Sequence, residues 1–179
     1  FGALSAGLDK SLNDSLVTDY AKIVDDARTL GASRLRIGMM PFPAMESAEA
    51  LSAFCRQAEE VAIRLADDGL TLYYHNHHIE FAKRGGTTVL DIIRAEAPTM
   101  RLEIDVHWVQ RGGKDPVRIL QKYAGLIDLV HLKDYRIGEM PAAAFESLNA
   151  GDYEAFMQAF TGVVQFAEVG EGSLELPGE

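Results

Sequence analysis

Residues Leu70-Thr71-Leu72-Tyr73-Tyr74 run directly into His75-Asn76-His77-His78. The threonine and tyrosine residues of this run are typical of a β-strand. The preceding segment, residues 47–69, has apolar residues at helical spacing, a serine suited to an N-cap and a closing glycine. The sequence therefore predicts a helix followed at once by a strand, with a group of histidines where the strand ends.

The same unit of helix and strand recurs on both sides of this stretch. Helices predicted over residues 14–30, 88–95 and 116–123 precede strands predicted at 34–38, 101–105 and 127–131. Such connections are too long for hairpins, and they favour parallel strands joined by right-handed βαβ units. After residue 134 the rhythm changes, and we expect an inserted loop over 138–150, a short helix over 152–160 and a strand over 163–168. The sequence predicts an α/β protein with a parallel sheet.

Composition sets the class of protein. The 179 residues are 47% apolar and 25% charged, which predicts one globular domain over residues 1–179. Seventeen Lys and Arg against 27 Asp and Glu give a net charge of −10, which disfavours nucleic acid and anionic membranes as partners. A single cysteine excludes a disulfide framework and a cysteine-rich metal site. Without a membrane-length apolar run or a charged segment at the start, the cytosol is the expected location.

The polar residues gather at one edge of the predicted sheet. The histidines fall at or just beyond the carboxyl ends of predicted strands and on no predicted helix, and acidic residues and a lysine accompany them: His75, His77, His78, His107, His131, Glu80, Asp105, Lys133, Asp134 and Glu168. This edge is where parallel α/β proteins bind ligands. Histidine and carboxylate side chains suit a divalent cation, Mn, Zn, Co, Fe or Mg.

Asp105 and His131 have the strongest claim to a metal, because each ends an apolar run. An unpaired carboxylate buried there would cost several kcal/mol, roughly, without a cation beside it. Side chains alternate along a strand, so His75 and His77 point to one face and Asn76 and His78 to the other. The histidines of this run therefore cannot all be ligands.

Five further residues each allow a structural and a functional interpretation. Lys133 and Asp134 either pair as a salt bridge at the rim or belong to the site. Glu168 and Glu171 are either solvated loop residues or site residues. Trp108 either fills the interior of a barrel or forms a wall on which a sugar stacks.

Four strings, in this order, resemble the sugar phosphate isomerase/epimerase family, the xylose-isomerase-like TIM barrels that also include endonuclease IV and inosose dehydratase. They are Tyr74-His75-Asn76-His77-His78-Ile79-Glu80-Phe81, Glu103-Ile104-Asp105-Val106-His107-Trp108-Val109, His131-Leu132-Lys133-Asp134-Tyr135 and Phe166-Ala167-Glu168-Val169-Gly170-Glu171-Gly172. The resemblance runs from about residue 5 to the C-terminus. It implies a (β/α)8 barrel, of which this chain covers the central part.

The resemblance also implies a divalent metal held by a Glu, an Asp, a His and a second Glu from four strands. Asp105 and His131 match the Asp and the His. Glu80 is favoured for the first Glu, with His75 or His77 as a substitute. The second Glu is expected on a later strand, outside residues 1–179.

The activity implied is that of a metal-dependent isomerase or epimerase, acting on a keto sugar or keto polyol by removing the proton next to a metal-bound carbonyl. Expected catalytic residues are Glu80, His107, Lys133 and Glu171. Expected substrate-binding residues are His75, His77, Trp108, Lys133 and Glu168. Alternatives are a lyase or hydrolase acting on a 3-keto-glycoside, an inosose-dehydratase-like enzyme, and a non-catalytic sugar-binding protein. The expected partner is a small sugar or polyol, and a homo-oligomer is a further expectation.

Overall fold

The computed structural model describes residues 2–10 and 14–174. The chain divides into two compact units, a first unit of residues 1–131 and a second unit of residues 132–179. Each unit contains its own sheet. The expectation of one domain over residues 1–179 stays a prediction.

The first unit is built on a five-stranded sheet within the described residues, and all its neighbouring strands are parallel. In sheet order the strands are β1 (Leu4–Ser5), β2 (Arg34–Ile37), β3 (Thr71–His75), β6 (Arg101–Asp105) and β7 (Ile127–His131). A short antiparallel hairpin, β4 (Lys83–Arg84) with β5 (Thr87–Thr88), lies between β3 and β6 in sequence. The α/β class and the parallel sheet are confirmed, while β1 is a strand that the sequence did not predict.

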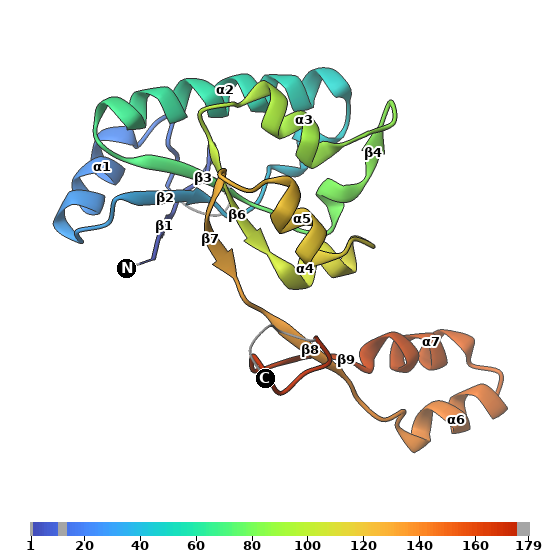
Figure 1. Cartoon of the computed structure of the whole chain (residues 1–179). Helices are drawn as coiled ribbons and strands as arrows, with labels where there is room; N and C mark the ends of the chain where they lie inside the picture. The colour runs from blue at the N-terminus through green and yellow to red at the C-terminus, as the bar shows by residue number, and fades with distance from the viewer. Residues whose placement is uncertain (1, 11–13, 175–179) are drawn as a thin grey trace. The chain divides into compact units, whose positions relative to one another are not determined.

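Helices connect these strands (Figure 1). They are α1 (Tyr20–Thr29), α2 (Ala48–Asp67), α3 (Val89–Glu96), α4 (Val106–Arg111) and α5 (Pro116–Lys122), with 3-10 turns η1 (Phe42–Met45) and η2 (Ile79–Phe81). The predicted caps of α2 are confirmed, since the Ser47 side chain accepts a hydrogen bond from the N–H of Ala50 and Gly69 has a φ of +76°. Helix α1 starts later than predicted, and α4 was not predicted.

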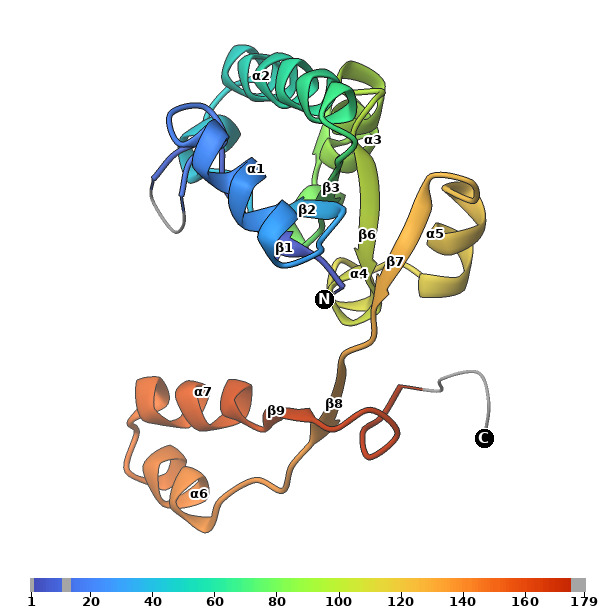
Figure 2. The ribbon, with the colours of Figure 1, turned by 90° about the vertical axis from the view of Figure 1, so that its left-hand side faces the viewer.

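The two faces of the sheet differ in polarity. One face packs against α1, α2 and α3, and its buried residues on the central strands are Leu35, Ile37, Leu72, Tyr74, Leu102 and Ile104. The alternating residues of the same strands point to the opposite face, where Arg36 and Glu103 form an ion pair of 2.6 Å. Figure 2 shows these strands and helices from a second side. The polar face therefore carries the candidate site at its carboxyl end.

In the second unit, β8 (Asp134–Ile137) pairs antiparallel with β9 (Val164–Ala167). Helices α6 (Ala142–Asn149) and α7 (Tyr153–Gly162) lie between them in sequence and pack side by side (Figures 1 and 2). The inserted loop predicted over 138–150 is wrong, because α6 occupies most of it: the alanines after Pro141 favour a helix. Among the described residues, no helix combines the length and the apolarity that crossing a membrane requires.

Candidate metal centre

Three side chains converge at the carboxyl ends of adjacent strands in the first unit. His75 ends β3, Asp105 ends β6 and His131 ends β7. Because these strands are parallel neighbours, their carboxyl ends lie at the same edge of the sheet, and Asp105 is in register with His131. His75 and Asp105 are buried, and His131 is half-buried.

The donor atoms of this cluster have the spacing of metal ligands. Asp105 Oδ2 lies 3.4 Å from His75 Nε2 and 3.2 Å from His131 Nδ1. The two imidazole nitrogens are 3.0 Å apart. Ligand atoms bound at about 2.1 Å to one cation lie about 3.0 to 3.4 Å from one another in octahedral or tetrahedral geometry. The three side chains therefore fit a divalent cation of the borderline class that prefers imidazole and carboxylate ligands.

Neighbouring groups orient two of the three candidate ligands, His75 and Asp105. His75 Nδ1 lies 3.2 Å from the carbonyl oxygen of Gly38, which can only accept, so Nδ1 carries the proton and Nε2 presents its lone pair to the cluster. Asp105 Oδ1 accepts the N–H of Trp108 at 3.0 Å and caps α4. That bond leaves Oδ2 facing the histidines.

The electrostatics favour the protonation states that a metal needs. Burial raises the pKa of Asp105, but contacts with His75, the Trp108 N–H and His131 outweigh it, and the pKa lies below its usual value. Burial lowers the pKa of His131, and Asp105 opposes this only in part. An ionised carboxylate beside a neutral imidazole at neutral pH is ready to bind a cation without releasing a proton.

Aromatic rings continue the site beyond His75. The ring of His77 is 4.9 Å from that of His75 and 5.3 Å from Trp108, and His78 stacks on Trp108 at 5.2 Å. His77 and Trp108 are half-buried. The structure thus brings two of the predicted substrate-binding residues, His77 and Trp108, next to the candidate metal cluster.

His107 is placed differently from the expectation that no histidine lies on a helix. It lies in α4, fully buried, with its ring edge-on to Trp108 at 4.8 Å. The expectation is wrong because Asp105 caps a helix directly after β6, so the residue two positions on is already helical. A catalytic role for His107 stays a prediction.

Glu80 is not among the side chains brought together with Asp105 and His131. It is fully buried, and its carboxylate oxygens accept the Tyr74 hydroxyl at 2.6 Å and the N–H of His77 at 2.8 Å. Burial raises the pKa of Glu80. Of the three candidates for the first ligand, the structure brings His75 to the cluster. Roles for Glu80 in metal binding and catalysis stay predictions.

Lys133, Glu168 and Glu171 belong to the second unit. Lys133 Nζ lies 4.1 Å from the centre of the Phe166 ring, and both glutamates are exposed. Their predicted roles at the site stay predictions. Asp134 is buried, and its carboxylate accepts backbone N–H groups from Tyr135, Gly170, Gly172 and Leu174. Asp134 therefore holds the loop after β9 against β8.

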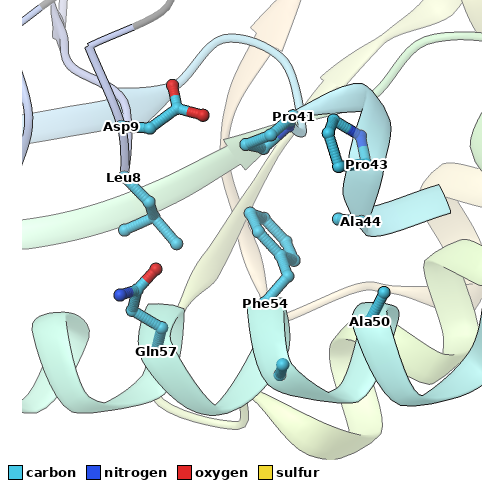
Figure 3. A pocket seen from close by; sticks show the side chains of 9 residues that line it. Leu8, Asp9, Pro41, Pro43, Ala44, Ala50, Phe54 and Gln57 are labelled. Atoms are coloured by element: carbon cyan, nitrogen blue, oxygen red, sulfur yellow. The ribbon is translucent and has the colours of Figure 1, made fainter. Parts of the chain in front are cut away.

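A separate cleft of about 360 Å³ lies between the loop after β1, the turn η1 and the first half of α2 (Figure 3). Its lining is mostly apolar, with Phe54 and Leu8 inside and Asp9 and Gln57 as the polar members. The described residues that line it include none of the predicted site residues.

Comparisons with known proteins bear on the fold. No protein-family model matches the sequence, and no curated protein matches it. Solved structures do match. A sugar phosphate isomerase/epimerase from Parabacteroides distasonis is 22% identical, with a TM-score of 0.59, over 85% of this chain and 59% of that one. The probable 3-DHS dehydratase AsbF, involved in petrobactin synthesis, from Bacillus anthracis is 16% identical, with a TM-score of 0.60, over 97% and 62%.

A xylose isomerase domain protein from Planctomyces limnophilus is 16% identical, with a TM-score of 0.53, over 90% of this chain and 66% of that one. The chain thus spans about 59% of the length of the first of these relatives. The resemblance drawn from the four sequence strings is confirmed at the level of the fold. The chain has the fold of the sugar phosphate isomerase/epimerase and xylose-isomerase-like proteins, as part of a TIM barrel.

Proposed function

We propose that the protein is a metal-dependent isomerase or epimerase of a keto sugar or keto polyol. The observation that carries the proposal is the cluster of His75, Asp105 and His131, whose donor atoms lie 3.0 to 3.4 Å apart at the carboxyl ends of three adjacent parallel strands. The substrate class comes from the similarity of the fold to a sugar phosphate isomerase/epimerase. The proposed location is the cytoplasm, with a small sugar or polyol as partner.

A divalent cation held by these side chains would polarise a ketone carbonyl and lower the pKa of the neighbouring C–H. The protein's part is to hold the cation with ligands that are already oriented. The carbonyl of Gly38 fixes His75, and the N–H of Trp108 fixes Asp105. Little then has to reorganise when the substrate binds.

Proton transfer requires a titratable side chain that the substrate can reach. Glu80 and His107 are fully buried, whereas His77 is half-buried and its ring lies 4.9 Å from that of His75. We therefore assign the proton transfer to His77, and the stacking of the sugar ring to Trp108. Lys133, with Glu168 and Glu171, remains proposed for charge stabilisation and for binding hydroxyl groups.

A dehydratase or lyase is the second candidate, favoured by the similarity of the fold to a probable 3-DHS dehydratase. Its first step is the same proton removal, followed by loss of a β-hydroxyl group. An action on abasic DNA is disfavoured because the net charge is −10.

Hydrogen exchange tests the proposal before the substrate is known. The protein, loaded with Mn²⁺ or Co²⁺, is incubated in heavy water with ketoses, ketose phosphates, inososes and 3-keto-glycosides. We expect at least one compound to gain one deuterium, or to lose water if the protein is a dehydratase. Asp105→Asn should abolish the exchange, and Asp26→Asn, which changes an exposed carboxylate on α1, should leave it unchanged.

Three outcomes would contradict the proposal. Binding of metal and sugar without any exchange would indicate a sugar-binding protein. Cleavage of abasic DNA would show that the charge argument is wrong. Hydrogen exchange that persists in Asp105→Asn would show that the metal cluster is not needed for the proton transfer.

A further inference from the structure

Asn76 occupies the point where β3 leaves the sheet. The ladder between β3 and β6 runs as far as His75 opposite Glu103. One residue later the backbone of β3 turns away, and the fully buried side chain of Asn76 takes its place. Its Oδ1 accepts the N–H of Asp105 at 2.9 Å, and its Nδ2 donates to the carbonyl of Asp105 at 3.4 Å.

This pairing is chemically specific. In a parallel sheet the N–H and the C=O of one residue point toward the same neighbouring strand. At Asp105 that strand is β3, whose backbone no longer pairs there, so a donor and an acceptor would be buried without partners. A carboxamide offers one acceptor and two donors on a planar group, and it satisfies both.

We infer that Asn76 is a positioning residue for the metal centre: its amide fixes the backbone of Asp105 against β3 and so sets where the Asp105 carboxylate stands relative to His75. His75 and Asp105 come from different strands, and Asn76 directly follows His75 in sequence while its side chain holds the backbone of Asp105. The inference rests on the proposed metal centre, and it does not depend on which reaction takes place there.

The arrangement explains how one residue serves three tasks. Asp105 ends β6, caps α4 through Oδ1 and presents Oδ2 to the histidines at 3.4 and 3.2 Å. A small rotation of its backbone would break the cap or misdirect Oδ2. The two bonds from Asn76 oppose that rotation, as partners of metal ligands commonly do.

Cobalt spectroscopy tests the inference, because the visible absorption of bound Co²⁺ reports the geometry of its ligands. Asn76→Leu removes both bonds and keeps the number and branching of the side-chain heavy atoms, and Asn76→Asp keeps only the acceptor. We expect each variant to bind Co²⁺ about ten-fold more weakly or worse, and to shift the absorption bands. Loss of stability alone would not move the bands of the folded protein.

Ser15→Ala is the matched control. Ser15 is also a buried polar residue of the first unit, and its hydroxyl donates to the carbonyl of Leu8 at 2.8 Å, away from the cluster. Its removal should lower the thermal midpoint but leave the cobalt affinity and spectrum unchanged. Wild-type cobalt spectra in both Asn76 variants would overturn the inference while leaving the metal centre in place. No cobalt binding by the wild-type protein would overturn both.

A measurement on the wild-type protein tests the inference even if the Asn76 variants fail to fold. In a titration with Zn²⁺ followed by NMR, the side-chain amide of Asn76 and the backbone N–H of Asp105 should shift together and saturate at one equivalent. Signals that remain unmoved while zinc binds would contradict the inference.

Discussion

In the candidate metal centre, hydrogen bonds from neighbouring groups fix the orientation of His75 and Asp105. The carbonyl of Gly38 selects the tautomer of His75 in which Nε2 can bind. The amide of Asn76 and the N–H of Trp108 hold the two ends of Asp105. At the residue scale, the site is a pre-oriented donor set, and its affinity should respond to changes in ligands far more than to changes in nearby rings.

Replacing either histidine of the cluster should weaken metal binding. His75→Ala and His131→Ala each remove one donor, and we expect the dissociation constant for Co²⁺ to rise by more than about ten-fold. His78→Ala is the control, because His78 is exposed and stacks on Trp108 outside the cluster. Calorimetric titration gives the constants. An equal loss in all three variants would mean that the effect is not one of ligand removal.

Metal affinity should also depend on pH in one direction. The pKa values of His131 and Asp105 lie below their usual values in the folded protein, so both stay deprotonated to lower pH than in a free peptide. Affinity for Co²⁺ should change little between about pH 8 and pH 7 and fall below about pH 6, where protons compete for the His131 imidazole. Affinity that rises on acidification would contradict this.

The sequence predicts part of this site. Asp105 and His131 are predicted because each ends an apolar strand. The choice among His75, His77 and Glu80 could not be made from spacing. It depends on how the loop after β3 turns back, so that Glu80 reaches the Tyr74 hydroxyl inside the helix-facing core. A rule that favours the residue at the strand end itself would have selected His75.

At the scale of elements, Asp91 joins α3 to the end of α5. Its carboxylate accepts the Tyr123 hydroxyl at 2.7 Å, the Thr88 hydroxyl at 2.7 Å and the Lys122 ammonium. Burial raises the pKa of Asp91, but these bonds outweigh it and bring the pKa below its usual value. A lowered pKa means that the ionised form contributes stability.

Asp91→Asn should therefore lower the free energy of unfolding by about 1 to 2 kcal/mol at pH 7. The contribution is complete above the unfolded pKa of about 3.9 and is lost as pH falls through the lower folded value, so the two proteins should converge below about pH 3. Urea unfolding at both pH values measures this. Asp26→Asn, which removes an exposed i,i+4 pair with Lys22, should cost less than about 0.5 kcal/mol. A constant difference at every pH would rule out the ionic contribution.

The elements that the sequence missed have identifiable causes. Strand β1 is two residues long and is recognisable only through its pairing with Leu35 and Arg36. Helix α4 has six residues and begins at once after β6, so it is too short to show a helical period in the sequence. Helix α6 has a weak apolar face, and Ala144 is its one buried residue in the described part of the chain. Long amphipathic elements such as α2 are predicted well, because burial imposes the period.

At the scale of the whole molecule, exposed apolar residues are concentrated toward the end of the described chain. Helices α6 and α7 leave Phe145, Tyr153 and Phe160 at 53%, 67% and 53% exposure. Surfaces of this kind favour association. The alternation of helices and strands along the sequence predicts the parallel sheet. The exposure of the aromatic side chains on α6 and α7 depends on three-dimensional packing, which the sequence pattern does not give.

We expect the protein to self-associate through these residues. Phe160→Ser and Phe145→Ser should each lower the weight-average mass in sedimentation at micromolar concentration. Ile63→Ser, which changes a residue 51% exposed on α2, should not. A wild-type protein that is monomeric at every concentration would contradict this expectation, as would an equal effect of Ile63→Ser.

The proposed function depends on one divalent cation held by His75, Asp105 and His131. X-ray absorption of the zinc-loaded protein counts the imidazoles bound to the metal and tests the claim directly. We expect two imidazole ligands at about 2.0 to 2.1 Å in the wild-type protein, and one in each of His75→Ala and His131→Ala. Zinc without imidazole ligands, or two imidazoles retained in both variants, would contradict it.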